Sequence, residues 1–99
     1  MVQIEEMFTR FIEGKPRAKR KWQMVCVNVG TRRCIHFYHY HHLVAIYDTI
    51  DKRFYYEWYE VPADYRGLAS IKAYMTDIET RDEVIRVAKE ETVYYETNR

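Results

Sequence analysis

The chain lacks the features that mark most classes of enzyme and membrane protein. It has no apolar run of the roughly eighteen or more residues that a membrane-spanning helix needs, and no basic start followed by an apolar stretch and a small-residue cleavage site. Glycine is too scarce to form a phosphate-binding loop, and the single serine, Ser70, lies outside any Gly-x-Ser-x-Gly motif. We therefore expect a protein that is not an enzyme, is not exported and does not contact a membrane.

Two cysteines and four histidines supply metal-ligand chemistry without the spacing of a metal site. His39 and His41 lie two residues apart on one predicted strand near Cys26, and Cys34 and His36 lie at a predicted hairpin mouth. No Cys-x-x-Cys or His-x-x-x-His pattern occurs, and a structural zinc needs four converging ligands. We expect no metal and no other cofactor, with the histidines hydrogen-bonded among tyrosines.

The redox state of the two cysteines stays open at this point. Cys26 and Cys34 would face each other only across a symmetric three-residue loop centred on Gly30, and a four-residue loop separates them. Disulfides do occur inside the cells of hyperthermophiles. The four-residue loop favours two reduced, buried thiols.

Serine, asparagine and glutamine are scarce, with one, two and two residues, whereas charged residues make up 31% of the chain. This imbalance is typical of proteins from hot habitats, so we expect a thermostable protein. Apolar residues make up 47% of the 99 residues, which supplies enough bulk for a core without a stabilising metal. Residues 1–99 are expected to form a single domain.

Helical spacing of apolar residues predicts helices at both ends of the chain. The first ends before Gly14 and Pro16, and its buried stripe comprises Ile4, Met7, Phe8, Phe11 and Ile12. Near the C-terminus a helical hairpin is expected. One of its helices buries Leu68, Ile71, Met75 and Ile78; the other starts at a capping box, Thr80-Arg-Asp-Glu83, and buries Val84, Ile85 and Ala88.

Three strands are predicted between these helices: Trp22–Val29, residues 34 to about 47, and residues 53–61. Four-residue loops would pair Val29 with Cys34 and Tyr47 with Lys52. The predicted fold is α+β, a three-stranded antiparallel meander with the helices on one face. A fourth strand could come from the β-prone stretch Thr92-Val-Tyr-Tyr95.

Aromatic rings and imidazoles alternate along two of these strands, in the runs 36–42 and 54–59. Alternation gives the sheet two apolar faces, and three helices can hardly cover both. The uncovered face is expected to dock a partner, most simply a second copy of the chain in a homodimer. The expected contact residues are Tyr38, Tyr40, Tyr55 and Tyr59.

Residues 15–47 carry seven basic side chains and no acidic one, whereas both flanking segments are net acidic. This indicates an anionic partner, an acidic neighbouring subunit, or internal neutralisation in the fold. Basic side chains beside exposed rings also suit single-stranded nucleic acid, although no RNP-type motif is present. That alternative function would use Lys19, Arg20, Lys21, Arg32 and Arg33 with the same tyrosines.

The depletion of Ser, Asn and Gln and the runs His36-Phe-Tyr-His-Tyr-His-His42 and Phe54-Tyr-Tyr-Glu-Trp-Tyr59 carry a resemblance over the whole chain. The chain resembles the small orphan proteins of filamentous archaeal viruses of the Acidianus filamentous virus type, with relatives in lipothrixviruses and rudiviruses of hot acid springs. The resemblance implies an acid-stable viral accessory protein in the cytoplasm of an infected archaeal host. It implies a viral or host protein as a further possible partner, and no catalytic residue.

Overall fold

The computed structural model of the protein describes residues 2–16 and 21–97. An N-terminal helix, α1 (Val2–Ile12), precedes a sheet of four strands in the order β1-β2-β3-β4. All neighbouring strands are antiparallel, which confirms the predicted α+β meander. The strands are β1 (Trp22–Val29), β2 (Arg32–His39), β3 (His42–Asp48) and β4 (Arg53–Glu57), and the helices that follow are α2 (Pro62–Thr76) and α3 (Ile78–Thr97).

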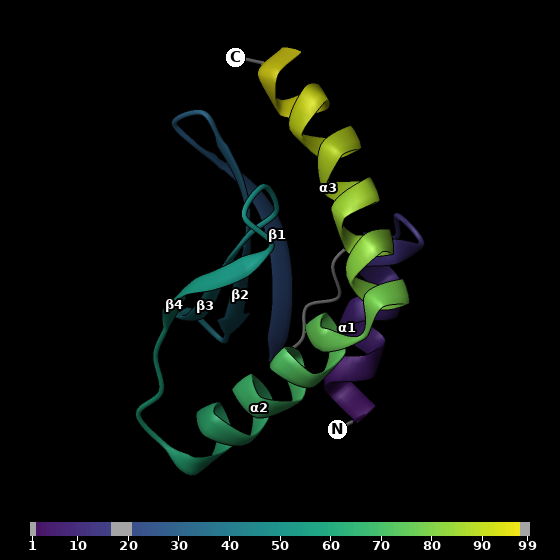
Figure 1. Cartoon of the computed structure of the whole chain (residues 1–99). Coiled ribbons are helices and arrows are strands. Elements are labelled where there is room, and N and C mark those ends of the chain that lie inside the picture. The colour runs from purple at the N-terminus through teal and green to yellow at the C-terminus, as the bar shows by residue number, and fades with distance from the viewer. Residues whose placement is uncertain (1, 17–20, 98–99) are drawn as a thin grey trace.

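All three helices lie on the same side of the sheet (Figure 1). Helix α1 packs against β1 and α3, α3 packs against β1 and β2, and α2 packs against β3. We call the side of the sheet that faces the helices the inner face and the opposite side the outer face. The part of the chain that the structure describes places no helix over the outer face.

The core fills the space between the inner face and the helices. The predicted stripe of α1 is confirmed, and Phe8 packs its ring against Phe37 of β2 and Tyr74 of α2, at centroid distances of 5.9 and 4.9 Å. The buried residues that the sheet contributes from its inner face are Trp22, Met24, Cys26, Ile35, Phe37, His39, Val44, Ala45 and Tyr47. Burial of this apolar area is the main favourable contribution to folding.

The strand predicted to run from residue 34 to about 47 is instead two strands, β2 and β3, which reverse at Tyr40-His41. Tyr40 adopts a left-handed backbone conformation with φ of 58°. The turn contains no glycine or proline from which it could have been predicted. The fourth strand arises from this division. The prediction that Thr92-Val-Tyr-Tyr95 might form it is wrong, because these residues belong to α3.

Both predicted hairpin registers differ from the observed ones by two residues. The β1–β2 loop has two residues, Gly30 and Thr31, so Val29 pairs with Arg32 rather than with Cys34. Gly30 has φ of 63°, as the first position of such short loops favours. In the second hairpin Tyr47 pairs with Phe54 rather than with Lys52. A two-residue shift keeps each side chain on its expected face, because side chains alternate with period two.

Two register irregularities change which residues share a face. Between β2 and β3 the extra residue makes both Val44 and Ala45 part of the buried core. Between β3 and β4, Tyr47 pairs with Phe54 and Ile46 with Tyr56, which leaves Tyr55 as the extra residue. Adjacent residues at a bulge do not alternate as they do elsewhere. Tyr55 and Tyr56 therefore both lie on the outer face, whereas strict alternation predicted Tyr56 on the inner one.

Helices α2 and α3 meet at Asp77 and diverge from there (Figure 1). The side chain of Asp77 accepts hydrogen bonds from the backbone N–H and the hydroxyl of Thr80, at 3.0 and 2.8 Å. The last helix is therefore capped by Asp77 and begins at Ile78, and not at the predicted capping box that starts with Thr80. Ile78, predicted to be buried, is exposed in the first turn of α3. Among the described residues, no helix combines the length and the apolar character that crossing a bilayer requires.

A buried histidine and aspartate connect the sheet to α2. Asp64, fully buried in the first turn of α2, is hydrogen-bonded to Nδ1 of His39 and accepts the backbone N–H groups of Glu60 and Val61 at 3.1 and 3.2 Å. Burial alone would raise the pKa of Asp64, but the hydrogen bonds from His39, Val61 and Glu60 outweigh it and lower this pKa. The carboxylate is thus held ionised and fixes the position of α2 on the sheet.

Candidate functional site

The outer face is a surface of the sheet that no helix covers in the described part of the chain. Its residues alternate along the strands with those of the core, and the register brings them into four adjacent rows. Its apolar and aromatic members are Val25, Val27, Cys34, His36, Tyr38, Leu43, Ile46, Tyr55 and Tyr56. Exposed apolar and aromatic patches of this kind mark contact surfaces in soluble proteins.

Tyrosines dominate the exposed part of this face. Tyr55 and Tyr56 expose 50% and 38% of their surface, although both are large aromatic residues. Tyr38, Leu43 and Ile46 are half-buried, because neighbouring side chains of the same face shield them. Tyrosine combines a large apolar ring with a hydroxyl that both donates and accepts hydrogen bonds, which suits it to interfaces.

His36 lies on this face, where its ring is 6.2 Å from that of Tyr38. Its two ring nitrogens are shielded from solvent, and neither has a hydrogen-bond partner in the described part of the chain. Burial lowers the pKa of His36, so the ring is neutral at pH 7, with one donor and one acceptor. Each unsatisfied polar group costs roughly 1–3 kcal/mol of folding free energy. His36 is therefore a polar side chain that the isolated subunit leaves without hydrogen bonds.

The two cysteines are both buried. Cys34 is fully buried on the outer face, with its sulfur 3.7 Å from the hydroxyl of Tyr55, and burial raises the pKa of its thiol. Cys26 is buried on the inner face, where its sulfur is 3.5 Å from the carbonyl oxygen of Ala88. Because the two side chains lie on opposite faces of the sheet, the observed register does not allow a disulfide between them. The raised pKa keeps the thiol of Cys34 protonated, and a protonated thiol is a poor nucleophile and a poor metal ligand.

No group of three or more metal-ligating side chains comes together within the described ranges. His39 is hydrogen-bonded to Asp64, and its ring stacks on Trp22. His41 lies exposed in the turn that follows β2. Cys26 and Cys34 lie on opposite faces. The candidate ligands considered in the sequence are thus distributed over separate environments.

A cluster of charged side chains lies at one end of the outer face. Arg32 donates to the carboxylates of Asp48 and Asp51, at 2.5 and 2.9 Å, and Asp48 also accepts the backbone N–H groups of Ile50 and Asp51. Burial of Asp48 would raise its pKa, but the hydrogen bonds from Asp51, Ile50 and Arg32 lower it overall. The charge of Arg32 is therefore neutralised within the subunit.

The four predicted contact tyrosines fall into two groups. Tyr38 and Tyr55 lie on the outer face. Tyr40 lies in the β2–β3 turn beside His39, and Tyr59 precedes α2, with its ring 5.1 Å from that of Tyr65. His36 and Tyr56 were not selected in the sequence as contact residues. The bulge that exposes Tyr56 depends on strand pairing, and the hydrogen bonding of His36 depends on the fold. Neither can be recognised from the neighbouring residues in the sequence.

The three described basic residues of the nucleic-acid alternative, Lys21, Arg32 and Arg33, are not gathered in one place. Lys19 and Arg20 lie outside the described residues. Lys21 precedes β1, whereas Arg32 and Arg33 pair with the last residues of β1, about 23 Å away along the strand. Arg32 is engaged by two carboxylates, which leaves Arg33 as the member that turns toward a different part of the surface.

Comparisons of the chain with protein-family models, with curated proteins and with solved structures find no match.

Proposed function

We propose that the protein is a non-enzymatic interaction module that forms a homodimer through the outer face of its sheet. The observation that carries this proposal is the exposed outer face, where Tyr55 and Tyr56 expose 50% and 38% of their surface and no helix of the described residues covers them. A partner that brings hydroxyl groups to this surface could hydrogen-bond with these tyrosines, because a hydroxyl both donates and accepts. Tyr38, Tyr55 and Tyr56 of a second copy carry such hydroxyls.

A second copy of the chain is the occupant that fits this surface best. A two-fold interface joins the same patch of both subunits, so the patch must be complementary to itself. The centre of the outer face is uncharged. At one end Arg32 is neutralised by Asp48 and Asp51, and Arg53 lies opposite Asp48. Two copies can thus approach through the centre of the face without repulsion between like charges. A nucleic acid, by contrast, needs a basic surface.

The backbone of Tyr40 supports a contact role at the adjoining end of the sheet. This residue exposes 57% of its surface and holds φ of 58°, which costs a residue other than glycine roughly 1–2 kcal/mol. The ring of Tyr40 contacts the ring of His39, and this contact is what it contributes to the stability of the isolated subunit in return for the backbone strain. We include Tyr40 and Tyr59, which is equally exposed, at the rim of the interface.

The same proposal makes the protein a viral accessory protein in the cytoplasm of an infected archaeal cell, which rests on the resemblance of its aromatic runs alone. In that setting a viral or host protein would compete with the second copy for the outer face. The dimer is the primary proposal, because it follows from the chemistry of the face.

Light scattering after size exclusion tests the dimer, with the protein loaded from low to high micromolar concentration. The wild type is expected to have twice the monomer mass. Tyr56→Glu places a charge on the outer face of each copy and should give a monomer with an unchanged circular dichroism spectrum. Ile78→Glu is the matched control, since Ile78 is exposed on the helical side. A wild type that is monomeric at high micromolar concentration contradicts the proposal.

A further inference from the structure

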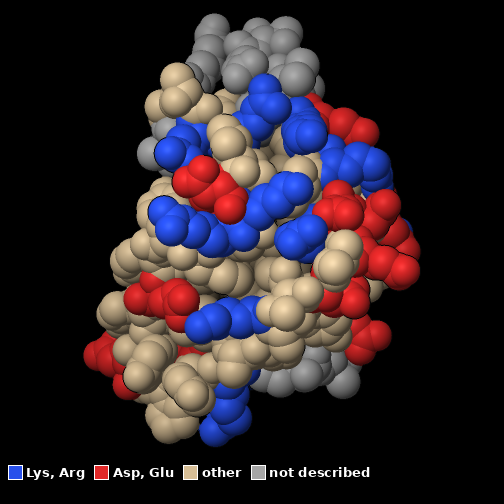
Figure 2. Space-filling view, viewed as in Figure 1, with Lys and Arg blue, Asp and Glu red and all other residues tan. Residues whose placement is uncertain are grey.

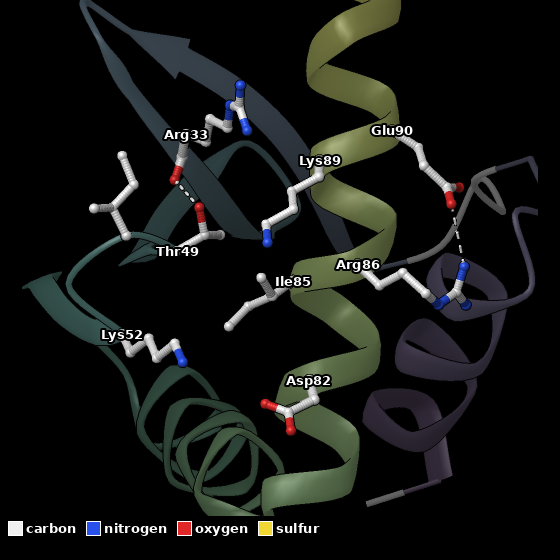
Figure 3. A pocket seen from close by; sticks show the side chains of 9 residues that line it. Arg33, Thr49, Lys52, Asp82, Ile85, Arg86, Lys89 and Glu90 are labelled. Carbon is white, nitrogen blue, oxygen red and sulfur yellow. Dashed lines mark hydrogen bonds and ion pairs between the residues drawn. The ribbon is translucent and has the colours of Figure 1, made fainter.

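A pocket of about 750 Å³ lies between the end of the sheet and α3. Its walls come from Arg33 of β2, from the β3–β4 loop and from one side of α3 (Figure 3). The loop contributes Thr49, Ile50 and Lys52, and α3 contributes Asp82, Ile85, Arg86, Lys89 and Glu90. The volume falls in the range of pockets that bind small molecules and cofactors.

Three cations of this pocket have no counter-ion. Arg33, Lys52 and Lys89 form no ion pair with any carboxylate among the described residues. Lys52 and Lys89 point from opposite walls toward the space between the loop and α3 (Figure 3). Figure 2 shows lysine and arginine gathered over the upper half of the same side of the molecule. Three unpaired positive charges on one pocket repel one another, and an anion between them would remove that cost.

The other charges of the pocket largely cancel. Arg86 donates to Glu83 and Glu90, at 2.7 and 3.4 Å, and Arg81 lies 3.4 Å from the carboxylate of Asp82. The acidic residues of the pocket, Asp82 and Glu90, are thus each paired with an arginine of the same helix. The uncompensated charge of the lining is positive.

The β3–β4 loop holds its share of the pocket in a fixed position. The carboxylate of Asp48 accepts hydrogen bonds from the backbone N–H groups of Ile50 and Asp51, at 2.8 and 3.1 Å. The backbone carbonyl oxygen of Asp48 accepts a hydrogen bond from the backbone N–H of Lys52, at 2.8 Å. The buried Thr49 donates its hydroxyl to the carbonyl oxygen of Arg33 at 2.7 Å. The loop is therefore ordered before any ligand arrives, which lowers the entropic cost of binding.

We propose that this pocket binds the phosphate group of a nucleotide, either free or within a single-stranded nucleic acid. A phosphate offers several acceptor oxygens, and Arg33, Lys52 and Lys89 line the pocket from three different elements. The side chains of Ile50, which is exposed, and Ile85 provide apolar surface beside the cations for a sugar or base. A carboxylate has only two oxygens and one negative charge, so a phosphate matches this group of three cations better.

This site is independent of the proposed dimer. The pocket lies between the sheet end and α3, whereas the dimer would use the opposite side of the sheet. It shares only Arg33 with the basic residues that the sequence suggested for nucleic-acid binding. Its other two cations, Lys52 and Lys89, come from segments far apart in the chain.

Fluorescence anisotropy with a labelled oligothymidine at low salt tests the site, with ADP and inorganic phosphate as competitors. Lys52→Gln/Lys89→Gln is expected to weaken oligothymidine binding roughly tenfold or more and to flatten the slope of log K against log salt by about 1.4, for two lost phosphate contacts. Arg66→Gln/Lys72→Gln removes the same charge from α2 and should bind like the wild type. Thermal unfolding checks that both variants fold.

Competition separates the two sources of phosphate. Displacement of oligothymidine by ADP supports a free nucleotide as ligand, and binding of the strand without displacement by ADP supports single-stranded nucleic acid. Either outcome needs the loss in Lys52→Gln/Lys89→Gln. Absence of binding by both probes at low salt, equal binding by this variant, or displacement by a glutamate decamer as effective as by unlabelled oligothymidine would overturn the proposal. The monomeric Tyr56→Glu variant should retain binding, which separates this result from the test of the dimer.

Discussion

The indole of Trp22 stacks on the imidazole of His39, with ring centroids 4.2 Å apart and planes inclined by 10°. The same indole occupies the space above Gly67 of α2, where a Cβ atom would lie 2.1 Å from two of its ring carbons. His39 is in turn bonded to Asp64, three residues before Gly67. These four residues join the first two strands to α2.

Gly67→Ala is therefore expected to destabilise the protein, although alanine favours a helix by about 1 kcal/mol over glycine. The added methyl group must displace Trp22 from the core, and overpacking of this kind costs roughly 1–3 kcal/mol or more. Urea unfolding measures the difference. Ala69→Gly, at an exposed position of α2, is a control that reports helix propensity alone. A more stable Gly67→Ala protein would show that the contact with Trp22 is absent.

Asp64→Asn should lower stability by about 2 kcal/mol at pH 7, because an amide oxygen replaces a carboxylate that binds His39 and two backbone N–H groups. The lowered pKa of Asp64 gives this contribution a pH dependence. It is fully present above the unfolded carboxyl pKa of 3.8 and is lost as the pH falls through the lower folded value. Urea unfolding at several pH values should show the gap between wild type and variant closing in strong acid. A gap that does not change with pH contradicts the assignment.

His36 predicts a second pH dependence, at milder acidity. Its folded pKa lies below the unfolded value of 6.5, so the unfolded chain binds the proton more readily, and the folded protein loses stability as the pH falls from 6.5 through the folded pKa. His36→Phe should remove this decline in both subunit stability and dimer formation. His41→Phe changes an exposed histidine and should keep it. Unfolding and light scattering between pH 7 and pH 5 compare the three proteins, and an equal decline in all three would exclude His36 as its source.

Tyr40 allows backbone strain to be separated from side-chain contact. Tyr40→Ala removes the ring but keeps a Cβ atom at φ of 58°, whereas Tyr40→Gly also removes the strain. The glycine variant should be more stable than the alanine variant by about 1 kcal/mol. Chemical unfolding of the monomeric Tyr56→Glu background measures this without interference from association. Equal stability of the two variants would mean that the turn is not left-handed in solution.

The elements of the fold could largely be predicted from the sequence, because their signals are local. The spacing from Ile4 to Ile12 predicts α1, and the alternation along β1 places Trp22, Met24 and Cys26 on one face as observed. Two-residue errors next to both hairpin loops kept the neighbouring side chains on their expected faces, whereas the irregularity between Ile46 and Tyr47 moved Tyr56 to the outer face. The reversal at Tyr40 was missed, since turns at a positive φ are usually found through glycine, asparagine or aspartate.

The candidate sites depend on contacts between distant parts of the chain, and these have no local signal. Tyr38 and Tyr55 were selected from the alternation, whereas the bulge that adds Tyr56 is a property of strand pairing. The pocket is lined by Arg33, Lys52 and Lys89, which are far apart in the sequence. Its charge becomes visible only once Arg32, Arg81 and Arg86 are found in ion pairs and these three cations are not.

The most direct test of the outer-face dimer is a dilution series followed by the backbone amide resonances of the isotopically labelled protein. The proposed interface predicts shifts that depend on concentration at His36, Tyr38, Ile46 and Tyr56, with constant resonances for the solvent-facing residues of α2. Spectra that stay unchanged from high to low micromolar concentration, or shifts confined to the helices, would contradict it.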